Sequence, residues 1–82
     1  MQFFRAAMLA GRIAHLRPGD GAPLRAVSII TADGGLTYSV CGNHPQTGRW
    51  RRPYRTERVC SACLVSARRR ARRAGETLAV TP

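Results

Sequence analysis

The stretch CSACLVSARRRARRAG, residues 60–75, indicates how this chain folds. Cys60 and Cys63 stand at the beginning of a segment rich in alanine, leucine and arginine, which are good helix formers. Gly75 follows as a natural stop, because glycine readily takes the left-handed conformation that ends many helices. The pattern therefore predicts a helix over residues 61–74 whose first turn carries a C-x-x-C pair.

One side of the predicted helix carries small residues, and the remaining surface is basic. Small residues recur at intervals of three and four, which places them on a stripe that can pack closely against the rest of the domain. That stripe contains Cys60, Cys63, Ala67, Ala71 and Ala74. Arginines occupy the remaining surface at Arg68, Arg69, Arg70, Arg72 and Arg73. Like charge at this density repels itself, which favours a bound polyanion over a merely solvated surface.

A second pair of ligand residues precedes the first. Cys41-Gly42-Asn43-His44 has the same two-residue gap, and fifteen residues separate the two pairs. Zinc prefers four sulfur or nitrogen donors in a tetrahedron, and Gly42 permits the tight turn that such a pair needs. A helix start also stabilises thiolate, the form that binds metal. The predicted ligands of one structural Zn²⁺ are Cys41, His44, Cys60 and Cys63.

Other interpretations of the cysteines stay open. They could be small core residues. A redox C-x-x-C pair expects a preceding βαβ pattern, which is missing, and a disulfide would leave one of the three cysteines over. His15 has no partner nearby in the sequence, and we interpret it as an ordinary surface or packing histidine.

The sequence contains no set of residues that indicates catalysis. Four protein ligands close the predicted zinc site, whereas catalytic zinc keeps one position open for water. The four acidic residues are scattered singly, so they form neither a carboxylate pair nor part of a nucleophile–base set. We therefore expect that the protein is not an enzyme.

The segments before the zinc ligands predict a helix and a hairpin. Residues 2–16 are rich in alanine, methionine, leucine and arginine, which favours a helix. The competing interpretation is a strand over residues 12–16 that opens a meander. Residues 24–31 and 36–40 gather β-branched residues on either side of a glycine-containing turn, which predicts a β-hairpin.

The predicted fold class is small α+β, in one domain. Eighty-two residues are too few for two independent cores, and a core of this size is marginal without a staple such as a metal ion. We expect one zinc-stabilised domain over residues 1–76. Residues 1–35 would hold the N-terminal helix and the first hairpin strand, and residues 36–76 the zinc-finger-like part. Residues 77–82 are expected to be a flexible tail.

The charge of the chain is strongly basic and unevenly placed. Fourteen arginines face four acidic residues, for a net charge of +10, and residues 48–82 hold ten of the arginines. Residues 45–58 are predicted to be an irregular basic loop with Trp50 as its apolar anchor. No apolar run approaches the roughly 20 residues that span a bilayer, and no secretory signal is recognised. We expect an intracellular protein, cytoplasmic and nucleoid-associated or nuclear.

Three stretches resemble the GATA-type zinc finger, a treble-clef arrangement in which a knuckle and a helix start supply two ligands each. That family reads C-x-N-C, then W-R-R, then C-N-A-C at the start of a basic helix. The matching stretches here are residues 41–44, 50–52 and 60–63, and Trp50 precedes Cys60 by the family's ten residues. The resemblance covers about residues 38–74.

The chain also departs from that family. His44 replaces the second cysteine, and the loop before Trp50 is two residues short. Ser61 stands where the family has an asparagine that helps to read a base, and Leu64 replaces a glycine. The resemblance therefore implies a zinc fold with a nucleic-acid-facing helix, but not the family's own DNA target. Ribosomal and RNA-binding proteins use the same arrangement.

The first expectation for function is a small zinc-containing DNA-binding protein, a transcriptional regulator. Arginines of the loop and the helix would contact phosphates, because the guanidinium group suits them. These residues are Arg51, Arg52, Arg55, Arg68, Arg69, Arg70, Arg72 and Arg73. RNA or ribosome binding is the second expectation. The third is a protein-interaction module that docks on an acidic partner such as part of the transcription machinery. Membrane binding ranks last, since the helix has little apolar surface to insert.

Overall fold

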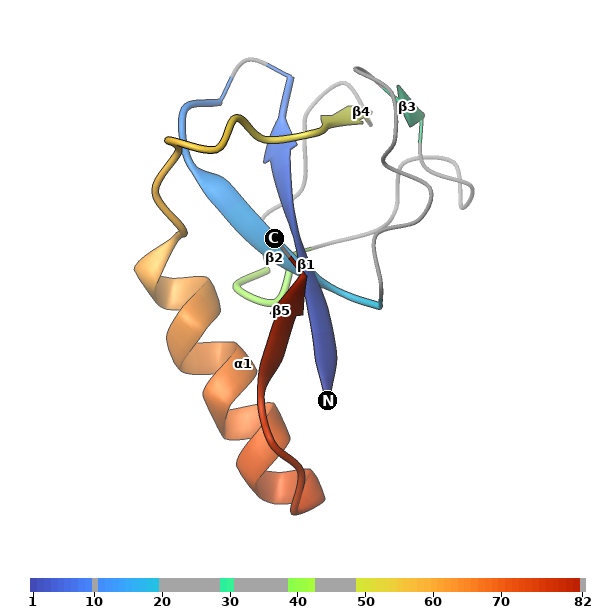
Figure 1. Ribbon diagram of the computed structural model, residues 1–82, viewed down its shortest axis with the longest axis vertical. Coiled ribbons are helices and arrows are strands. Elements are labelled where there is room, and N and C mark those ends of the chain that lie inside the picture. The colour runs from blue at the N-terminus through green and yellow to red at the C-terminus, as the bar shows by residue number, and fades with distance from the viewer. Residues whose placement is uncertain (10, 20–28, 31–38, 43–48, 82) are drawn as a thin grey trace.

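The computed structural model describes residues 1–9, 11–19, 29–30, 39–42 and 49–81, which form a small α+β fold (Figure 1). The strands are β1 (Gln2–Met8), β2 (Ala14–Pro18), β3 (Ile29–Ile30), β4 (Arg49–Arg51) and β5 (Ala79–Thr81), and the helix is α1 (Ser61–Ala74). β1 is the centre of the sheet. β2 pairs with one edge of β1. Along the other edge of β1, β5 pairs with its first residues and β4 pairs with its last residues.

The predicted N-terminal helix over residues 2–16 is wrong, because this segment forms β1 and most of β2. β1 buries consecutive pairs of residues, Phe3 with Phe4 and Ala6 with Ala7, so both faces of the strand are covered. A strand that is covered on both faces is apolar throughout and has no alternating pattern. Pairing with three other strands therefore overrides the helix propensity of its alanines. The competing strand over residues 12–16 was closer to the structure.

The predicted flexible tail over residues 77–82 is also wrong for its described part. β5 pairs in parallel with the first residues of β1, with Val80 opposite Phe3. The α-amino group of Met1 donates a hydrogen bond to the carbonyl of Thr77 at 2.6 Å, and the N–H of Ala79 donates one to the carbonyl of Met1 at 3.0 Å. The two ends of the described chain thus complete one edge of the sheet.

The helix prediction is confirmed, with the same first and last residues. α1 begins after Cys60 and ends before Gly75, whose φ of 66° is left-handed and whose N–H bonds the carbonyls of Ala71 and Arg72. Cys63, Ala67 and Ala71 of the predicted stripe are buried. Ala74 is exposed, because the stripe leaves the domain at the last turn.

The predicted hairpin lies mostly outside the described residues. Of its two strands, Ile29 and Ile30 form β3, which pairs antiparallel with β4. Val40 lies in a turn, and its N–H bonds the carbonyl of Leu16 at 2.9 Å. Among the described residues, no helix has both the length and the hydrophobicity to cross a membrane.

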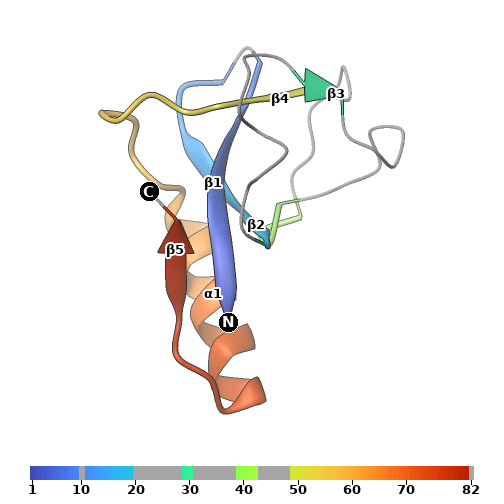
Figure 2. The ribbon, with the colours of Figure 1, turned by 45° about the vertical axis from the view of Figure 1, so that its right-hand side comes forward.

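Two small clusters make up the core, one on each face of β1. α1 passes behind β1 and β5 in Figure 2, and this side holds Phe3, Leu16, Val40, Cys63 and Ala67. The other cluster holds Phe4, Ala6 and Trp50, with Met8 packed against it. Neither cluster alone is a large core, so whatever joins them contributes directly to stability.

Candidate metal centre

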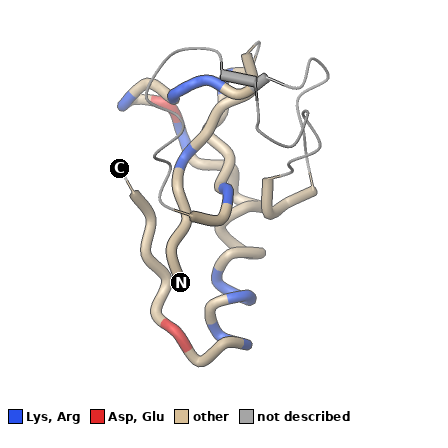
Figure 3. Tube along the Cα trace, turned by 90° about the vertical axis from the view of Figure 1, so that its right-hand side faces the viewer, with Lys and Arg blue, Asp and Glu red and all other residues tan. Residues whose placement is uncertain are grey.

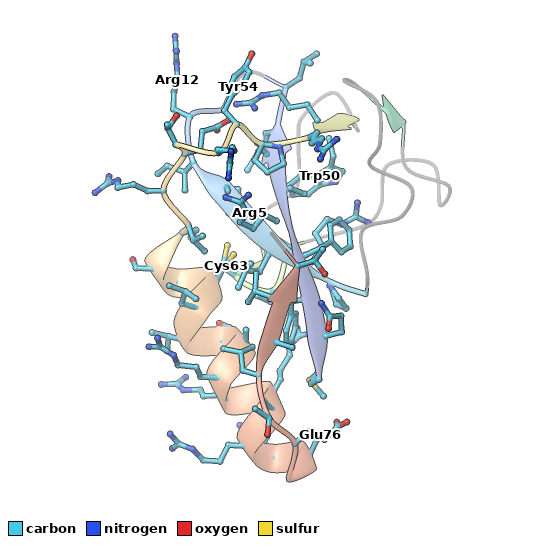
Figure 4. The ribbon with its side chains drawn as sticks, in the orientation of Figure 1. Arg5, Arg12, Trp50, Tyr54, Cys63 and Glu76 are labelled. Atoms are coloured by element: carbon cyan, nitrogen blue, oxygen red, sulfur yellow. The ribbon has the colours of Figure 1, made fainter. Side chains whose placement is uncertain are left out.

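Four side chains from three separate segments bring their donor atoms together beside the start of α1. They are His15 of β2, Cys41 of the turn at residues 39–42, Cys60 at the N-cap of α1, and Cys63 in its first turn. One nitrogen or sulfur of each lies within 4.8 Å of the others. Figure 4 shows the sulfur atoms gathered at Cys63, where α1 meets the sheet. These four residues could hold a metal ion.

The spacing of the donors suits a tetrahedral ion. His15 Nδ1 lies 3.6 Å from Cys41 Sγ and 3.6 Å from Cys63 Sγ. Zinc–sulfur and zinc–nitrogen bonds of about 2.3 and 2.0–2.1 Å place tetrahedral sulfur and nitrogen ligands roughly 3.5 Å apart. A disulfide would instead bring two sulfurs to about 2.05 Å, and all three cysteines are free. The geometry is therefore compatible with a coordination site.

Backbone hydrogen bonds on either side of His15 fix its place. The carbonyl of Ala14 accepts a bond from the N–H of Cys60 at 2.7 Å, and the N–H of Ala14 donates to the carbonyl of Arg58 at 2.8 Å. The carbonyl of Leu16 accepts from the N–H of Val40 at 2.9 Å. β2 therefore holds both cysteine-bearing segments through the two residues that flank the histidine.

The turn that carries Cys41 is tight, as predicted. Gly42 has a φ of 92°, a conformation that side chains with a Cβ rarely adopt, and its N–H bonds the carbonyl of Ser39 at 2.9 Å. Ser39 Oγ lies 3.2 Å from Cys41 Sγ and is buried with its residue. A serine hydroxyl can donate to a thiolate, so Ser39 is placed to stabilise Cys41 as a ligand and to orient it.

Burial controls the protonation of the deepest cysteine. It raises the pKa of Cys63 to about 11, and hydrogen bonds from the backbone of Leu16 and Cys41 only partly oppose this rise. The expected stabilisation of thiolate by the helix start is therefore outweighed at Cys63 by desolvation. A metal cation reverses that balance, because it supplies the positive charge and displaces the thiol proton.

Three of the four predicted ligands are among the clustered residues, and a histidine that the sequence analysis dismissed joins them. Cys41, Cys60 and Cys63 come together, whereas His44 lies outside the described residues. The interpretation of His15 as an ordinary surface or packing residue needs correction, because His15 is only 8% exposed and its ring nitrogen faces two sulfurs. The strand over residues 12–16 was the signal that could have found it.

Trp50 packs behind the site, as predicted. It is fully buried, and its ring meets that of His15 edge to face, with 6.2 Å between centroids and 77° between planes. Trp50 belongs to one core cluster, and Cys63 belongs to the other. The candidate metal centre thus lies where the two clusters meet.

The predicted phosphate contacts divide into exposed and buried arginines. Exposed side chains are those of Arg52, Arg55, Arg68, Arg69, Arg70, Arg72 and Arg73. Figure 3 shows basic residues along α1 and at the opposite end of the molecule. Arg51 differs, because its guanidinium is buried and donates to both oxygens of Glu57 at 2.6 and 2.8 Å, and to the carbonyl of Gly11 at 2.8 Å. Arg51 is therefore a structural residue, and its assignment as a phosphate contact is withdrawn.

The Arg51–Glu57 pair has perturbed acid–base behaviour on both sides. The hydrogen bond from Arg51 lowers the pKa of Glu57 despite its burial, and the N–H of Tyr54 adds a second bond to the same carboxylate at 2.8 Å. The same pairing raises the pKa of Arg51. The pair is ionised at neutral pH and ties β4 to the segment that leads into α1.

No protein-family model, curated protein or solved structure matches this chain. The geometry of the site and the charge of the surface are therefore the grounds on which a function can be assigned.

Proposed function

We propose that His15, Cys41, Cys60 and Cys63 bind one structural Zn²⁺ ion. Three thiolates and one imidazole around a single point are the donor set of structural zinc, and four protein ligands leave no position for a substrate. The observation that supports this most is the 3.6 Å separation of His15 Nδ1 from two cysteine sulfurs of different segments. In this proposal β2 supplies the fourth ligand through His15, in place of the predicted His44.

The ion would act as a staple between the two core clusters. Cys63 is a member of the first cluster, Cys41 packs against it, and His15 contacts Trp50 of the second. Zinc bound in this place holds β2, the Cys41 turn and the start of α1 together, and metal-binding energy becomes folding energy. Native mass spectrometry of protein purified without chelator tests this. We expect one zinc per chain, and a chain that is folded yet carries no metal contradicts the proposal.

On this frame, α1 presents a basic surface that we propose binds nucleic acid, with DNA as the first candidate. α1 holds five arginines and no acidic residue, and all five arginines are exposed. Arg68, Arg69, Arg72 and Arg73 recur at i, i+1, i+4 and i+5, so they share the side opposite the buried stripe. A rigid, uniformly basic helix side fits the phosphates that flank a groove. In this role the protein would act as a small transcriptional regulator.

Salt dependence tests the nucleic-acid proposal. Each arginine that neutralises a phosphate releases counterions. If six of the exposed arginines each neutralise one phosphate, the slope of log affinity against log salt should be roughly −5 for duplex DNA. Fluorescence anisotropy with a labelled duplex, titrated at several salt concentrations, measures that slope. An affinity that is independent of salt, or no binding at low salt, contradicts the proposal.

A second candidate function, docking on an acidic protein, is favoured by a hollow beside the C-terminal end of α1. Met1, Phe3, Pro18, Arg70, Arg73 and Ala74 line a volume of about 500 Å³. Arg73 of the lining is one of the four outward arginines, whereas Arg70 is not, and both stand beside apolar side chains that could receive a hydrophobic anchor flanked by carboxylates. Arg70→Glu should weaken capture of such a partner while Arg69→Glu spares it. Equal effects of the two substitutions contradict this function.

A further inference from the structure

Tyr54 is an exposed aromatic side chain in the most basic loop of the described chain. The side chain of Tyr54 is 69% exposed, whereas that of Trp50 in β4 is fully buried. Tyr54 lies in the segment between β4 and α1, which we call the Tyr54 loop and define as residues 52–58. A single exposed ring is common on a protein surface, so the groups around Tyr54 decide whether it can be a ligand site.

The loop holds Tyr54 in a defined position. Its N–H donates to Glu57 at 2.8 Å, and the N–H of Glu57 donates to its carbonyl at 3.2 Å, which closes a turn over residues 54–57. The guanidinium of Arg51 lies 4.9 Å from the centroid of the ring. Arg51 is itself fixed by Glu57 and by the carbonyl of Gly11. The tyrosine ring is thus the outer layer of a stack whose inner layer is a buried ion pair.

Among the described residues, the surroundings of Tyr54 are strongly basic. Arg52 and Arg55 flank it in the sequence and are exposed, and Arg12 lies at the same end of the molecule in Figure 4. Glu57, the one acid of the Tyr54 loop, is turned inward, where Arg51 and the N–H of Tyr54 engage its carboxylate. An approaching phosphate would therefore meet guanidinium groups beside the ring and no free carboxylate of this loop.

We infer that Tyr54 is a stacking platform for an unpaired base, so that the Tyr54 loop binds a single-stranded stretch of nucleic acid while α1 remains the duplex-facing side. An aromatic ring beside cationic groups that follow the backbone is the arrangement by which proteins bind single strands without reading sequence. A base in a duplex is already stacked on both faces, so it has no face to offer Tyr54. Arg52 and Arg55 would hold the phosphates next to the stacked base. This inference rests on the proposed nucleic-acid binding and specifies its substrate class.

Three ligands and three variants test the platform. The ligands are an oligothymidine, an oligouridine of the same length and a blunt DNA duplex of that length. Tyr54→Phe keeps the ring, Tyr54→Ala removes it, and Arg69→Glu, remote in sequence, is the matched charge control. Because Tyr54 is exposed, Tyr54→Ala removes the ring's contact with Arg51 but leaves the core clusters intact, and circular dichroism of each variant checks that the fold is retained.

The expected result is a selective loss. Tyr54→Ala should weaken single-strand binding by about 5- to 100-fold, the effect of losing one base–aromatic stack, and should leave duplex binding nearly unchanged. Tyr54→Phe should bind like the wild type, and Arg69→Glu should weaken all ligands alike. Quenching of a 2-aminopurine placed in the strand provides a direct readout, because stacking on the ring quenches it in the wild type and in Tyr54→Phe but not in Tyr54→Ala.

The outcomes separate this inference from the proposal beneath it. Salt-dependent binding with the same affinity in the wild type and in Tyr54→Ala overturns the platform and leaves nucleic-acid binding in place. A preference for the duplex that Tyr54→Ala does not alter has the same consequence. No binding of any of the three ligands at low salt overturns both. An effect of Tyr54 on DNA strands, on RNA strands or on both supports the platform and shows which sugar it accepts.

Discussion

At the scale of single residues, His15 has the most consequence for the candidate metal centre. Its imidazole is buried, its neighbours in β2 hydrogen-bond both cysteine segments, and its Nδ1 faces two sulfurs. A neutral imidazole in this place contributes a donor without adding negative charge. Three thiolates with one histidine would leave a formal charge of −1 on the proposed zinc centre, which nearby arginines can offset.

Replacing His15 by alanine should remove a ligand, whereas replacing His44 should not. We expect His15→Ala to lower zinc affinity by more than about 100-fold, since even outer-shell partners contribute 10- to 100-fold. Competition with a chromophoric chelator measures this, and His44→Ala is the matched control. Loss of metal in His44→Ala with retention in His15→Ala would return the fourth ligand to His44.

The buried pair of Arg51 and Glu57 predicts a pH-dependent contribution to stability. Glu57→Gln should lower the free energy of unfolding at pH 7 by about 1.5–3 kcal/mol, because a charge-assisted hydrogen bond is lost inside the protein. The pKa of Glu57 is lowered in the folded state, so its contribution is complete above the unfolded-state pKa of about 4.3 and is lost as pH falls through the folded-state value.

Chemical denaturation of both proteins at a series of pH values checks that contribution. Acid also displaces metal from thiolates, but it does so in the wild type and in Glu57→Gln alike, so the difference between the two isolates the carboxylate. The difference should shrink as the pH falls below about 4.3. A difference that stays constant in acid contradicts the role of the ion pair.

At the scale of elements, α1 separates its two tasks by side. The stripe that includes Cys63, Ala67 and Ala71 packs against the domain, and the arginines point away from it. Anchoring and the proposed binding would therefore involve different residues of one helix, so each could be changed without the other.

Alanine at Arg68 and Arg72 should weaken nucleic-acid binding without harming the fold. Alanine has the best helix propensity, so α1 should persist. If each arginine neutralises one phosphate, the salt slope for duplex DNA should become less negative by about 0.9 for each residue replaced. Anisotropy titrations measure the slope, with Arg70→Ala as the control on the side of the hollow. A slope unchanged by the double substitution argues against contact by this side of α1.

β5 is expected to stabilise the domain, although its sequence suggests a tail. Ending the chain after Leu78 removes three pairings with β1 and uncovers surface that Val80 covers next to the first core cluster. We expect a loss of about 2 kcal/mol, comparable to uncovering one valine-sized side chain. Thermal unfolding of the truncated and full chains measures this. Identical melting curves would show that β5 contributes nothing.

At the scale of the whole molecule, the proposed metal centre would join the two small core clusters into a single cooperative unit. Removing zinc with a chelator should therefore unfold the sheet and the helix together, because the ion joins the segments that carry both clusters. Far-ultraviolet circular dichroism reports α1, and Trp50 fluorescence reports the second cluster. The two signals should change at the same chelator concentration. Separate transitions would mean that the clusters are independent of the metal.

The sequence by itself determined the features that depend on neighbours along the chain. The bounds of α1, the Gly75 cap, the tight turn at Gly42 and the C-x-x-C pair at the helix start were all predictable. Each arises from the conformational preference of one residue or from the spacing of a few. The burial of Trp50 was predictable too, because it is the one large apolar side chain of a basic segment and is stabilised by removal from water.

Only the tertiary structure decided the features that depend on distant partners. His15 becomes a candidate ligand because β2 lies between the Cys41 turn and Cys60, and nothing near it in the sequence indicates this. β1 and β5 are strands because they complete one sheet, and Arg51 is buried because Glu57 neutralises it. Pairing energy between segments far apart in the chain exceeds the small differences in local propensity, so these residues take their roles from the fold.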